Sequence, residues 1–286
     1  MSAPPPDDRR RAYAAASKLT RDRMAAEAPL AAEALAAIEA SDIVVVPGGY
    51  DHVEQVLEAL GLPHVMVHPG QLASAGLHPG QLLVINCPGQ VSEIDLAAVR
   101  RFVDAGGTLF TTDWALRHVI EPAFPGVLAY NHRPTSDAVV RIEVLDPSSP
   151  YLAGVMDRRD DPQWWLEASS YPITVLDPAR VNVLLRSPEL GDQWGEEAVA
   201  VTFRHGEGEV FHMISHYYLQ RTDLRSGRHR MEASSYWAEK GMAMDAESEQ
   251  LADGLTLGDI ESAHSSARLF ANIASDKKRR QFRRPT

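Results

Sequence analysis

The sequence is poor in cysteine, in long apolar runs and in basic charge. Its single cysteine, Cys87, excludes an intramolecular disulfide and is typical of a reducing compartment. No stretch approaches the roughly 20 consecutive apolar residues that a membrane-spanning helix needs. Three consecutive arginines stand near the N-terminus without an apolar run behind them, so the pattern of a secretory signal is missing. We therefore expect a cytoplasmic protein with no membrane partner.

Acidic charge dominates the centre of the chain. The formal net charge is −11, and residues 24–275 carry 16 basic against 35 acidic side chains. Such a surface repels phosphates and disfavours a nucleic-acid partner. Basic residues gather at 7–23 and 276–286, where they could contact an acidic protein, a neighbouring subunit or RNA. The simpler interpretation is solvated helix ends and a frayed tail.

The chain has enough apolar residues for a substantial core, at 44% of 286. We divide it into an N-terminal helical extension at 1–40, an α/β domain at 41–275 and a basic tail at 276–286. A polar helix-and-loop insertion is expected at 219–262.

The extension begins with a proline-rich stretch, residues 1–8, that we expect to be disordered. Alanine-rich sequence from Arg9 to Ala40 predicts one or two helices, with Pro29 at a break or a first turn.

Apolar segments alternate with helical patterns over residues 42–122, which predicts a doubly wound, mostly parallel sheet. One helix is expected over Glu93–Ala105, because Ser92 and Asp95 have the spacing of a capping box. The predicted strands are 42–50, 64–68, 81–89 and 108–113.

The second half has a different pattern. "EAVAVTFRHGEGEVFHMIS" (Glu197–Ser215) predicts a hairpin with a tight turn, and 138–155 and 180–187 offer further strands. An amphipathic helix near 263–274 closes the domain. No repeat of fixed period is present, which excludes solenoids and propellers.

Three segments together resemble the class I glutamine amidotransferase-like superfamily, particularly its trehalose-utilisation-like branch. They are "LLVINCPG", "AGGTLFTTDWA" and "RHGEGEVFHMISHYY". The resemblance implies a flavodoxin-like α/β fold with a β-hairpin and helical additions. It also implies a crevice at the strand ends, where active members have a Gly-x-Cys-x-Gly nucleophile elbow and a histidine delivered by the late hairpin.

At the elbow the sequence departs from that pattern. Asp113 occupies the position of the cysteine, and Thr111 and Ala115 replace the glycines. A carboxylate is a far weaker nucleophile towards amides than a thiolate, so we expect no glutaminase activity. Cys87 lies one strand earlier, and we expect it to be buried and inert.

Asp113 and His216 are the candidate catalytic residues. They would form an acid–base pair if their side chains approach within about 3 Å. Asp113 could instead cap the helix that follows it, or act as a ligand anchor or a nucleophile. The candidate ligand-binding residues are Asn86, Gly89, Trp114 and Tyr217, although Tyr217 could also pack beneath the terminal helix.

Other residues gave weaker signals. Trp164 and Trp165 with Glu167 could border a ligand cleft or a subunit contact. His212 and His118 are expected to be structural. No metal-ligand spacing, phosphate-binding loop or dinucleotide fingerprint is present, so we predict no metal and no cofactor.

We hypothesise a non-hydrolysing domain that binds a small polar metabolite or a protein partner. The alternative is a hydrolase or isomerase-like enzyme acting on a sugar or polar metabolite through Asp113 and His216. A third hypothesis is a regulatory module that contacts RNA through its basic tail. Assembly as a homo-oligomer remains open.

Overall fold

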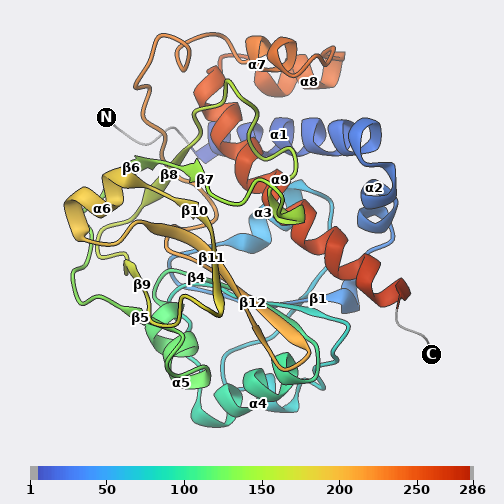
Figure 1. The fold of residues 1–286 in the computed structure, drawn as a ribbon. Helices are drawn as coiled ribbons and strands as arrows, with labels where there is room; N and C mark the ends of the chain where they lie inside the picture. Colours follow the sequence, from blue (N-terminus) through green and yellow to red (C-terminus); the bar gives the residue numbers. More distant parts are fainter. Residues whose placement is uncertain (1–5, 284–286) are drawn as a thin grey trace.

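The computed structural model describes residues 6–283 and is built around an eight-stranded sheet (Figure 1). Along the sheet the strands follow the order β2-β1-β3-β4-β12-β11-β10-β7. The first five are parallel to one another. They are β2 (Val65–Met66), β1 (Ile43–Val46), β3 (Leu82–Ile85), β4 (Thr108–Thr112) and β12 (Gly208–Met213).

This parallel half has the strand order of a flavodoxin-like sheet, with β12 as its fifth strand. The predicted α/β fold class is thereby confirmed. At the edge, β2 spans only Val65–Met66, shorter than the predicted 64–68, and both side chains are 42% exposed. A strand with one neighbour and no cover on its faces gains little from extending further.

The other half of the sheet is antiparallel. It contains β11 (Ala198–His205), β10 (Val181–Arg186) and β7 (Glu143–Val144). The predicted hairpin is present, because β11 and β12 pair from Ala200–Met213 to the closing pair His205–Gly208. Two small ribbons lie outside this sheet, β5 (Leu128–Tyr130) with β9 (Ile173–Val175) and β6 (Ala138–Arg141) with β8 (Gln163–Leu166).

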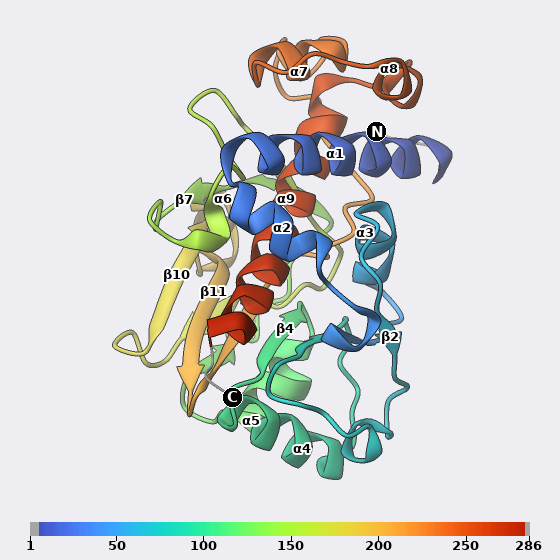
Figure 2. The ribbon, with the colours of Figure 1, turned by 90° about the vertical axis from the view of Figure 1, so that its right-hand side faces the viewer.

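Helices cover both faces of the sheet (Figures 1 and 2). On one face lie α4 (Glu93–Asp104), which begins at the predicted Ser92–Asp95 capping box, and the short α5 (Glu121–Ala123). On the opposite face α9 (Leu257–Arg283) packs against α1 (Pro6–Glu27) and α2 (Pro29–Ala36). The remaining helices are α3 (Val53–Ala59), α6 (Pro188–Trp194), α7 (Ser234–Glu239) and α8 (Ala246–Ala252).

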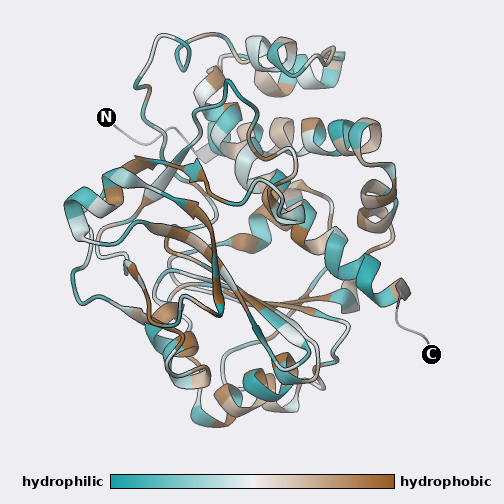
Figure 3. Cartoon of the chain, viewed as in Figure 1, coloured by the Kyte–Doolittle hydropathy of each residue, from teal (hydrophilic) through white to brown (hydrophobic). Residues whose placement is uncertain are grey.

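The core lies between the sheet and these helices. All side chains of β1, β3 and β4 are buried, as expected for parallel strands covered on both faces, and hydrophobic residues concentrate there in Figure 3. Phe110 of β4 stacks on Phe211 of β12 and meets Phe270 of α9 edge-on. These rings join the centre of the sheet to the helix that crosses it.

The chain ends differ from the prediction. Helix α1 already begins at Pro6, so residues 6–8 are helical where disorder was expected; residues 1–5 lie outside the described part. Helix α9 continues through Arg283 where a frayed tail was expected. Its basic side chains bind within the chain: Lys277 Nζ donates to the carbonyls of Pro79 and Gly106, and Lys278 pairs with Asp42.

Within residues 6–283, no helix combines the length and the hydrophobicity that a membrane span requires.

His212 links the two central parallel strands. Its Nδ1 lies 2.8 Å from Thr111 Oγ1 on β4, and its side chain is fully buried. Burial lowers the pKa of the imidazole to about 3, against an ordinary value of 6.5. His212 is therefore neutral in the folded protein near pH 7.

We expect this histidine to destabilise the fold in mild acid. Its folded-state pKa lies below the unfolded value of about 6.5, so its contribution is complete above that pH and is lost as the pH falls towards 3. Between pH 7 and pH 5 the free energy of unfolding should fall by about 2 kcal/mol on this account. This fall in the free energy of unfolding is measured by urea unfolding of the wild type and of His212→Gln at both pH values.

The control is His68→Gln, because His68 is exposed and its substitution should leave the pH dependence unchanged. The assignment would be wrong if His212→Gln kept the full wild-type loss of stability between pH 7 and pH 5.

Candidate functional site

The turn after β4 has the geometry of an elbow. Asp113 takes a φ of 45°, in the left-handed region that non-glycine residues rarely adopt. Its backbone N–H donates to Met213 O at 2.8 Å, which anchors the turn to the end of β12. The chain then enters a short π-helical turn, Leu116–Ile120. A strained residue at a strand-to-helix turn is the arrangement that presents a functional side chain in many α/β enzymes.

The carboxylate of Asp113 does not cap the following helix, so that interpretation is wrong. Its Oδ1 accepts the backbone N–H of Tyr171 at 2.8 Å, and its Oδ2 accepts the hydroxyl of Ser170 at 2.9 Å. Both donors belong to the loop between β8 and β9, 57 and 58 residues away along the chain. Asp113 thus fastens this loop, residues 167–171, over the elbow.

His216 follows β12 and lies between two carboxylates. Its Nε2 is 3.2 Å from Asp113 Oδ2, and its Nδ1 is 2.9 Å from Glu167 Oε2. The imidazole is 2% exposed, and Trp165 packs against it edge-on. The structure therefore brings Asp113 and His216 together and adds Glu167, which the sequence placed only beside an undefined cleft.

Electrostatics favour a protonated His216. Burial alone would lower the pKa of this imidazole, but its contacts with Asp113, Cys87 and Glu167 outweigh burial and raise it well above the ordinary value. The pKa of the Asp113 carboxyl is raised above its ordinary value, because burial outweighs the contacts with His216, the Tyr171 N–H and the Ser170 hydroxyl that lower it. We assign the pair as imidazolium and carboxylate, because the Tyr171 N–H and the Ser170 hydroxyl donate to Asp113 and two carboxylates flank His216.

Asp51 sets the position of the chain around His216. Its Oδ2 accepts the backbone N–H of Tyr217 at 2.7 Å, and its Oδ1 accepts those of Tyr218 at 3.0 Å and His52 at 2.7 Å. Asp51 is fully buried. Our sequence reasoning missed it, although an acidic residue just beyond the glycine turn of a buried strand was the available signal.

Cys87 lies closer to the site than the sequence suggested. It follows β3, next to β4 in the sheet, and its thiol contacts the ring of His216 and the backbone N–H of Trp114. The residue is 1% exposed, and burial raises the pKa of its thiol to about 11. In the described part of the chain, ligand atoms of Cys87, Asp113 and His216 all lie within 4.8 Å of one another. Neighbouring parallel strands end at the same edge of the sheet. Residues that follow adjacent strands, as Cys87, Asp113 and His216 do, therefore lie close together.

Asn86 and Gly89 build the turn beneath the site. Asn86 is fully buried; its Oδ1 accepts the backbone N–H of Val53, and its Nδ2 donates to Glu54 Oε2 at 2.8 Å. Gly89 has a φ of 71°, and a Cβ there would lie 2.8 Å from Ala115 Cβ. Both residues are engaged in holding the loop against its neighbours.

The loops after β1 and β3 meet where ligands usually bind in open α/β sheets. The backbone N–H of Gly49 donates to the carbonyl of Cys87 at 3.1 Å, and that of Tyr50 to the same carbonyl at 3.3 Å. A Cβ on Gly48 would lie 2.1 Å from this carbonyl oxygen. The two loops therefore contact each other directly through backbone atoms at this switch point.

Aromatic side chains lie next to Asp113, in Trp114, which follows it, and in Tyr171, whose backbone N–H it accepts. Trp114 is half-buried, stacks on Tyr171 at 5.4 Å between ring centroids and meets Tyr50 edge-on at 5.2 Å. Its Nε1 donates to the carbonyl of Ser169, a second residue with a positive φ, at 74°. Tyr50 is 47% exposed. We call Tyr50, Trp114, Tyr171 and Glu167 the aromatic surface.

Two other aromatic candidates lie in the core. Tyr217 is fully buried beneath α9, where its hydroxyl donates to the carbonyl of Ser266. Trp164 is fully buried, and its Nε1 donates to Ser265 Oγ at 3.1 Å. Trp164 therefore borders neither a cleft nor a subunit contact.

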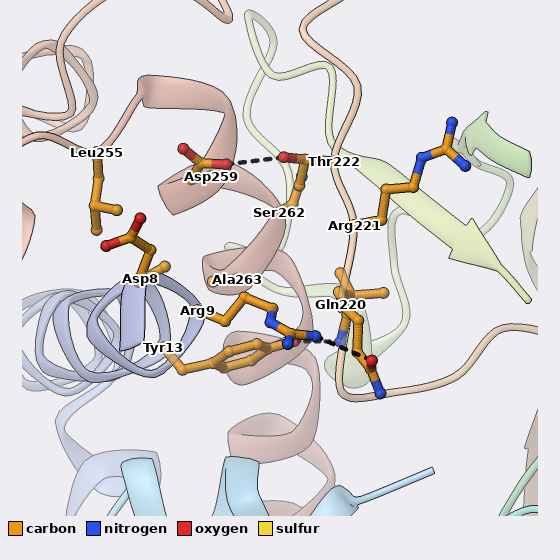
Figure 4. Close-up of a pocket in the computed structure, with 12 residues that line it drawn as sticks. Asp8, Arg9, Tyr13, Gln220, Arg221, Thr222, Leu255, Asp259, Ser262 and Ala263 are labelled. Atoms are coloured by element: carbon orange, nitrogen blue, oxygen red, sulfur yellow. Dashed lines mark hydrogen bonds between the residues drawn. The ribbon is translucent and has the colours of Figure 1, made fainter. Parts of the chain in front are cut away.

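A separate pocket lies where α1, residues 219–222 and the start of α9 meet (Figure 4). Its polar side chains pair with one another: Arg9 donates to Gln220 Oε1 at 3.0 Å, and Thr222 to Asp259 Oδ1 at 2.8 Å. It shares no lining residue with the elbow.

No protein-family model matches the chain, and no curated protein matches it. Among solved structures, the chain is similar to a putative ThuA-like protein from Bacteroides uniformis, at 10% identity over 62% of this chain and 82% of that chain, with a TM-score of 0.44. It is similar to PurLQS from Thermotoga maritima, at 16% identity over 79% of this chain and 96% of that one, with a TM-score of 0.48.

A further similarity is to a GH42 β-galactosidase of G. stearothermophilus, at 12% identity and a TM-score of 0.40. It covers 61% of this chain and 27% of the β-galactosidase, so the chain spans about a quarter of that protein's length. At such identities and scores, none of these similarities assigns a family or an activity to the chain.

The contact between the loops after β1 and β3 predicts that alanine substitutions at two adjacent glycines, Gly48 and Gly49, differ sharply in their effect on stability. Gly48→Ala should lower the free energy of unfolding by about 1–3 kcal/mol, because the new methyl group overlaps a backbone carbonyl. Gly49→Ala should change it by no more than about 0.5 kcal/mol, because nothing lies within 4 Å of the added Cβ. Chemical denaturation of both variants measures this, and equal effects would contradict the close approach.

Proposed function

We propose that this chain is a non-hydrolysing, amidotransferase-like domain that binds a small polar ligand, a saccharide, on its aromatic surface. The observation that carries the proposal is the elbow itself. It has a strained residue at the strand end, but that residue is a carboxylate that accepts hydrogen bonds from the 167–171 loop, and Trp114 beside it stacks on Tyr171 of that loop.

Glutamine hydrolysis does not fit this arrangement. The reaction needs an exposed thiolate at the elbow with a histidine ready to take its proton. Here the elbow carries Asp113, and the thiol of Cys87 belongs to the neighbouring strand and is 1% exposed. We therefore expect no release of ammonia from glutamine.

Acid–base catalysis by Asp113 and His216 is also disfavoured by their surroundings. The two residues are 1% and 2% exposed, beneath the 167–171 loop. Both oxygens of Asp113 already accept hydrogen bonds from that loop. A substrate would have to displace the loop before it could reach either group, whereas a ligand can contact the aromatic surface directly.

The aromatic surface suits a saccharide. Sugar rings present apolar C–H faces that stack on Trp and Tyr, and their hydroxyls donate to carboxylates. Trp114 and Tyr171 supply stacked rings, Tyr50 supplies an exposed one, and the side chain of Glu167 is 39% exposed beside them. Asp113 and Ser169 adjoin Trp114, since Asp113 precedes it and Ser169 accepts its indole N–H. Both have a positive φ, and backbone strain of this kind tends to occur at functional positions.

Titration with glucose and trehalose tests this proposal. We expect saturable binding by calorimetry, with a change in tryptophan fluorescence, and at least a tenfold weaker affinity in Trp114→Ala. Tyr50→Ala should weaken binding in the same direction without affecting folding, because Tyr50 is 47% exposed. Phe282→Ala is the matched control, since Phe282 is an exposed aromatic residue on α9, away from the elbow.

Two results would overturn the proposal. One is ammonia release from glutamine by the wild type that Asp113→Asn abolishes. The other is saccharide binding that is absent, or that Trp114→Ala and Tyr50→Ala leave unchanged.

A further inference from the structure

Three different metal-ligating side chains meet at the carboxyl edge of the sheet. Cys87, Asp113 and His216 follow β3, β4 and β12, which are adjacent in the sheet. One ligand atom from each lies within 4.8 Å of the other two, and all three residues are at most 2% exposed. We infer that Cys87, Asp113 and His216 form a binding site for a single Zn²⁺ ion.

The imidazole geometry supports this site independently of the clustering. Both ring nitrogens of His216 are buried, and neither makes a hydrogen bond of acceptable geometry to any group within residues 6–283. The carboxylates of Asp113, at 3.2 Å, and Glu167, at 2.9 Å, are thus close enough to form ion pairs with the ring. Their oxygens do not lie along the directions in which the ring nitrogens form hydrogen bonds. A buried polar atom without a hydrogen bond is costly, and a metal ion on Nε2 would remove that cost.

Glu167 completes the arrangement from behind. It lies on the Nδ1 side of the ring, whereas Asp113 lies on the Nε2 side. A carboxylate on that side favours the tautomer that carries its proton on Nδ1, in which Nε2 is free to bind metal. Glu167 is therefore a positioning residue, with no direct bond to the ion.

Charge and spacing select the metal. A thiolate, a carboxylate and a neutral imidazole together offset the two positive charges of Zn²⁺, which matters in a buried site. Binding releases the protons of the Cys87 thiol and of His216 Nε2 to water. In a tetrahedral zinc site, nitrogen and oxygen ligands lie about 3.3 Å apart, and the Asp113–His216 contact is 3.2 Å. Mg²⁺ and Ca²⁺ prefer oxygen ligands and do not favour a thiolate.

Because the site is enclosed, the ion would have a structural role. Three protein ligands leave one coordination position for a water molecule. Because the three ligands are buried and follow adjacent strands, the ion would fasten the ends of β3, β4 and β12 to one another.

Metal titration of the tag-free, chelator-treated chain tests the site. We expect one equivalent of Zn²⁺ to bind and to raise the thermal unfolding temperature. Co²⁺ should give the visible bands of tetrahedral coordination and a thiolate-to-cobalt charge-transfer band in the near ultraviolet. Cys87→Ser should abolish the charge-transfer band, Asp113→Asn should weaken zinc binding at least tenfold, and Glu167→Gln should weaken it about 10- to 100-fold.

His68→Ala is the control for adventitious binding, because its imidazole is exposed and it follows the edge strand β2, which β1 separates from β3. It should bind one equivalent with unchanged affinity. The metal-free melting temperature of each variant shows whether it folds.

The inference fails if the folded wild type binds less than one equivalent at millimolar Zn²⁺, or if Cys87→Ser retains both the affinity and the cobalt charge-transfer band. No saccharide is present in this experiment, so its outcome is separate from that of the proposed binding function.

Discussion

Burial of charge at the carboxyl edge of the sheet is the constraint on which the rest of the site depends. Asp51 and Asp113 are almost completely buried, and each is stabilised by donors from distant parts of the chain. Leaving either carboxylate unpaired in such surroundings would cost several kcal/mol. The backbone after β12 must therefore approach Asp51, and the loop after β8 must approach Asp113. These two requirements set the position of His216 and hold the 167–171 loop against it.

Much of the fold could be predicted from local patterns, whereas most of the site could not. Apolar runs and the Ser92–Asp95 capping box located the central strands and α4, because these signals lie within a few residues of the elements they form. The partners of Asp113 are 57 and 58 residues away in an irregular loop, and no periodicity encodes that contact. The position of Cys87 near Asp113 could have been predicted, because the strands that precede the two residues are neighbours in the sheet. We did not predict it, because we expected Cys87 to be buried and inert.

The resemblance to amidotransferases drew the prediction to the turn after β4, and it does not define the chemistry there. Asp113 keeps the strained backbone expected at an elbow, with a φ of 45°, while its side chain is directed into hydrogen bonds with Ser170 and Tyr171. Backbone geometry and side-chain chemistry are therefore separate observations at this position. A fold can retain the first because the sheet imposes it, and function has to be argued from the second.

The placement of β12 and α9 has a consequence for how the chain folds during synthesis. β4 lies beside β12 in the sheet, although about a hundred residues separate them, and α9 reaches back to the carbonyls of Pro79 and Gly106. An emerging N-terminal half would expose the edge of β4 until residue 213 had left the ribosome, and Lys277 docks later still. Such long-range closure makes folding slow and leaves a strand edge open to mispairing. The acidic net charge of the chain opposes association of such incomplete copies.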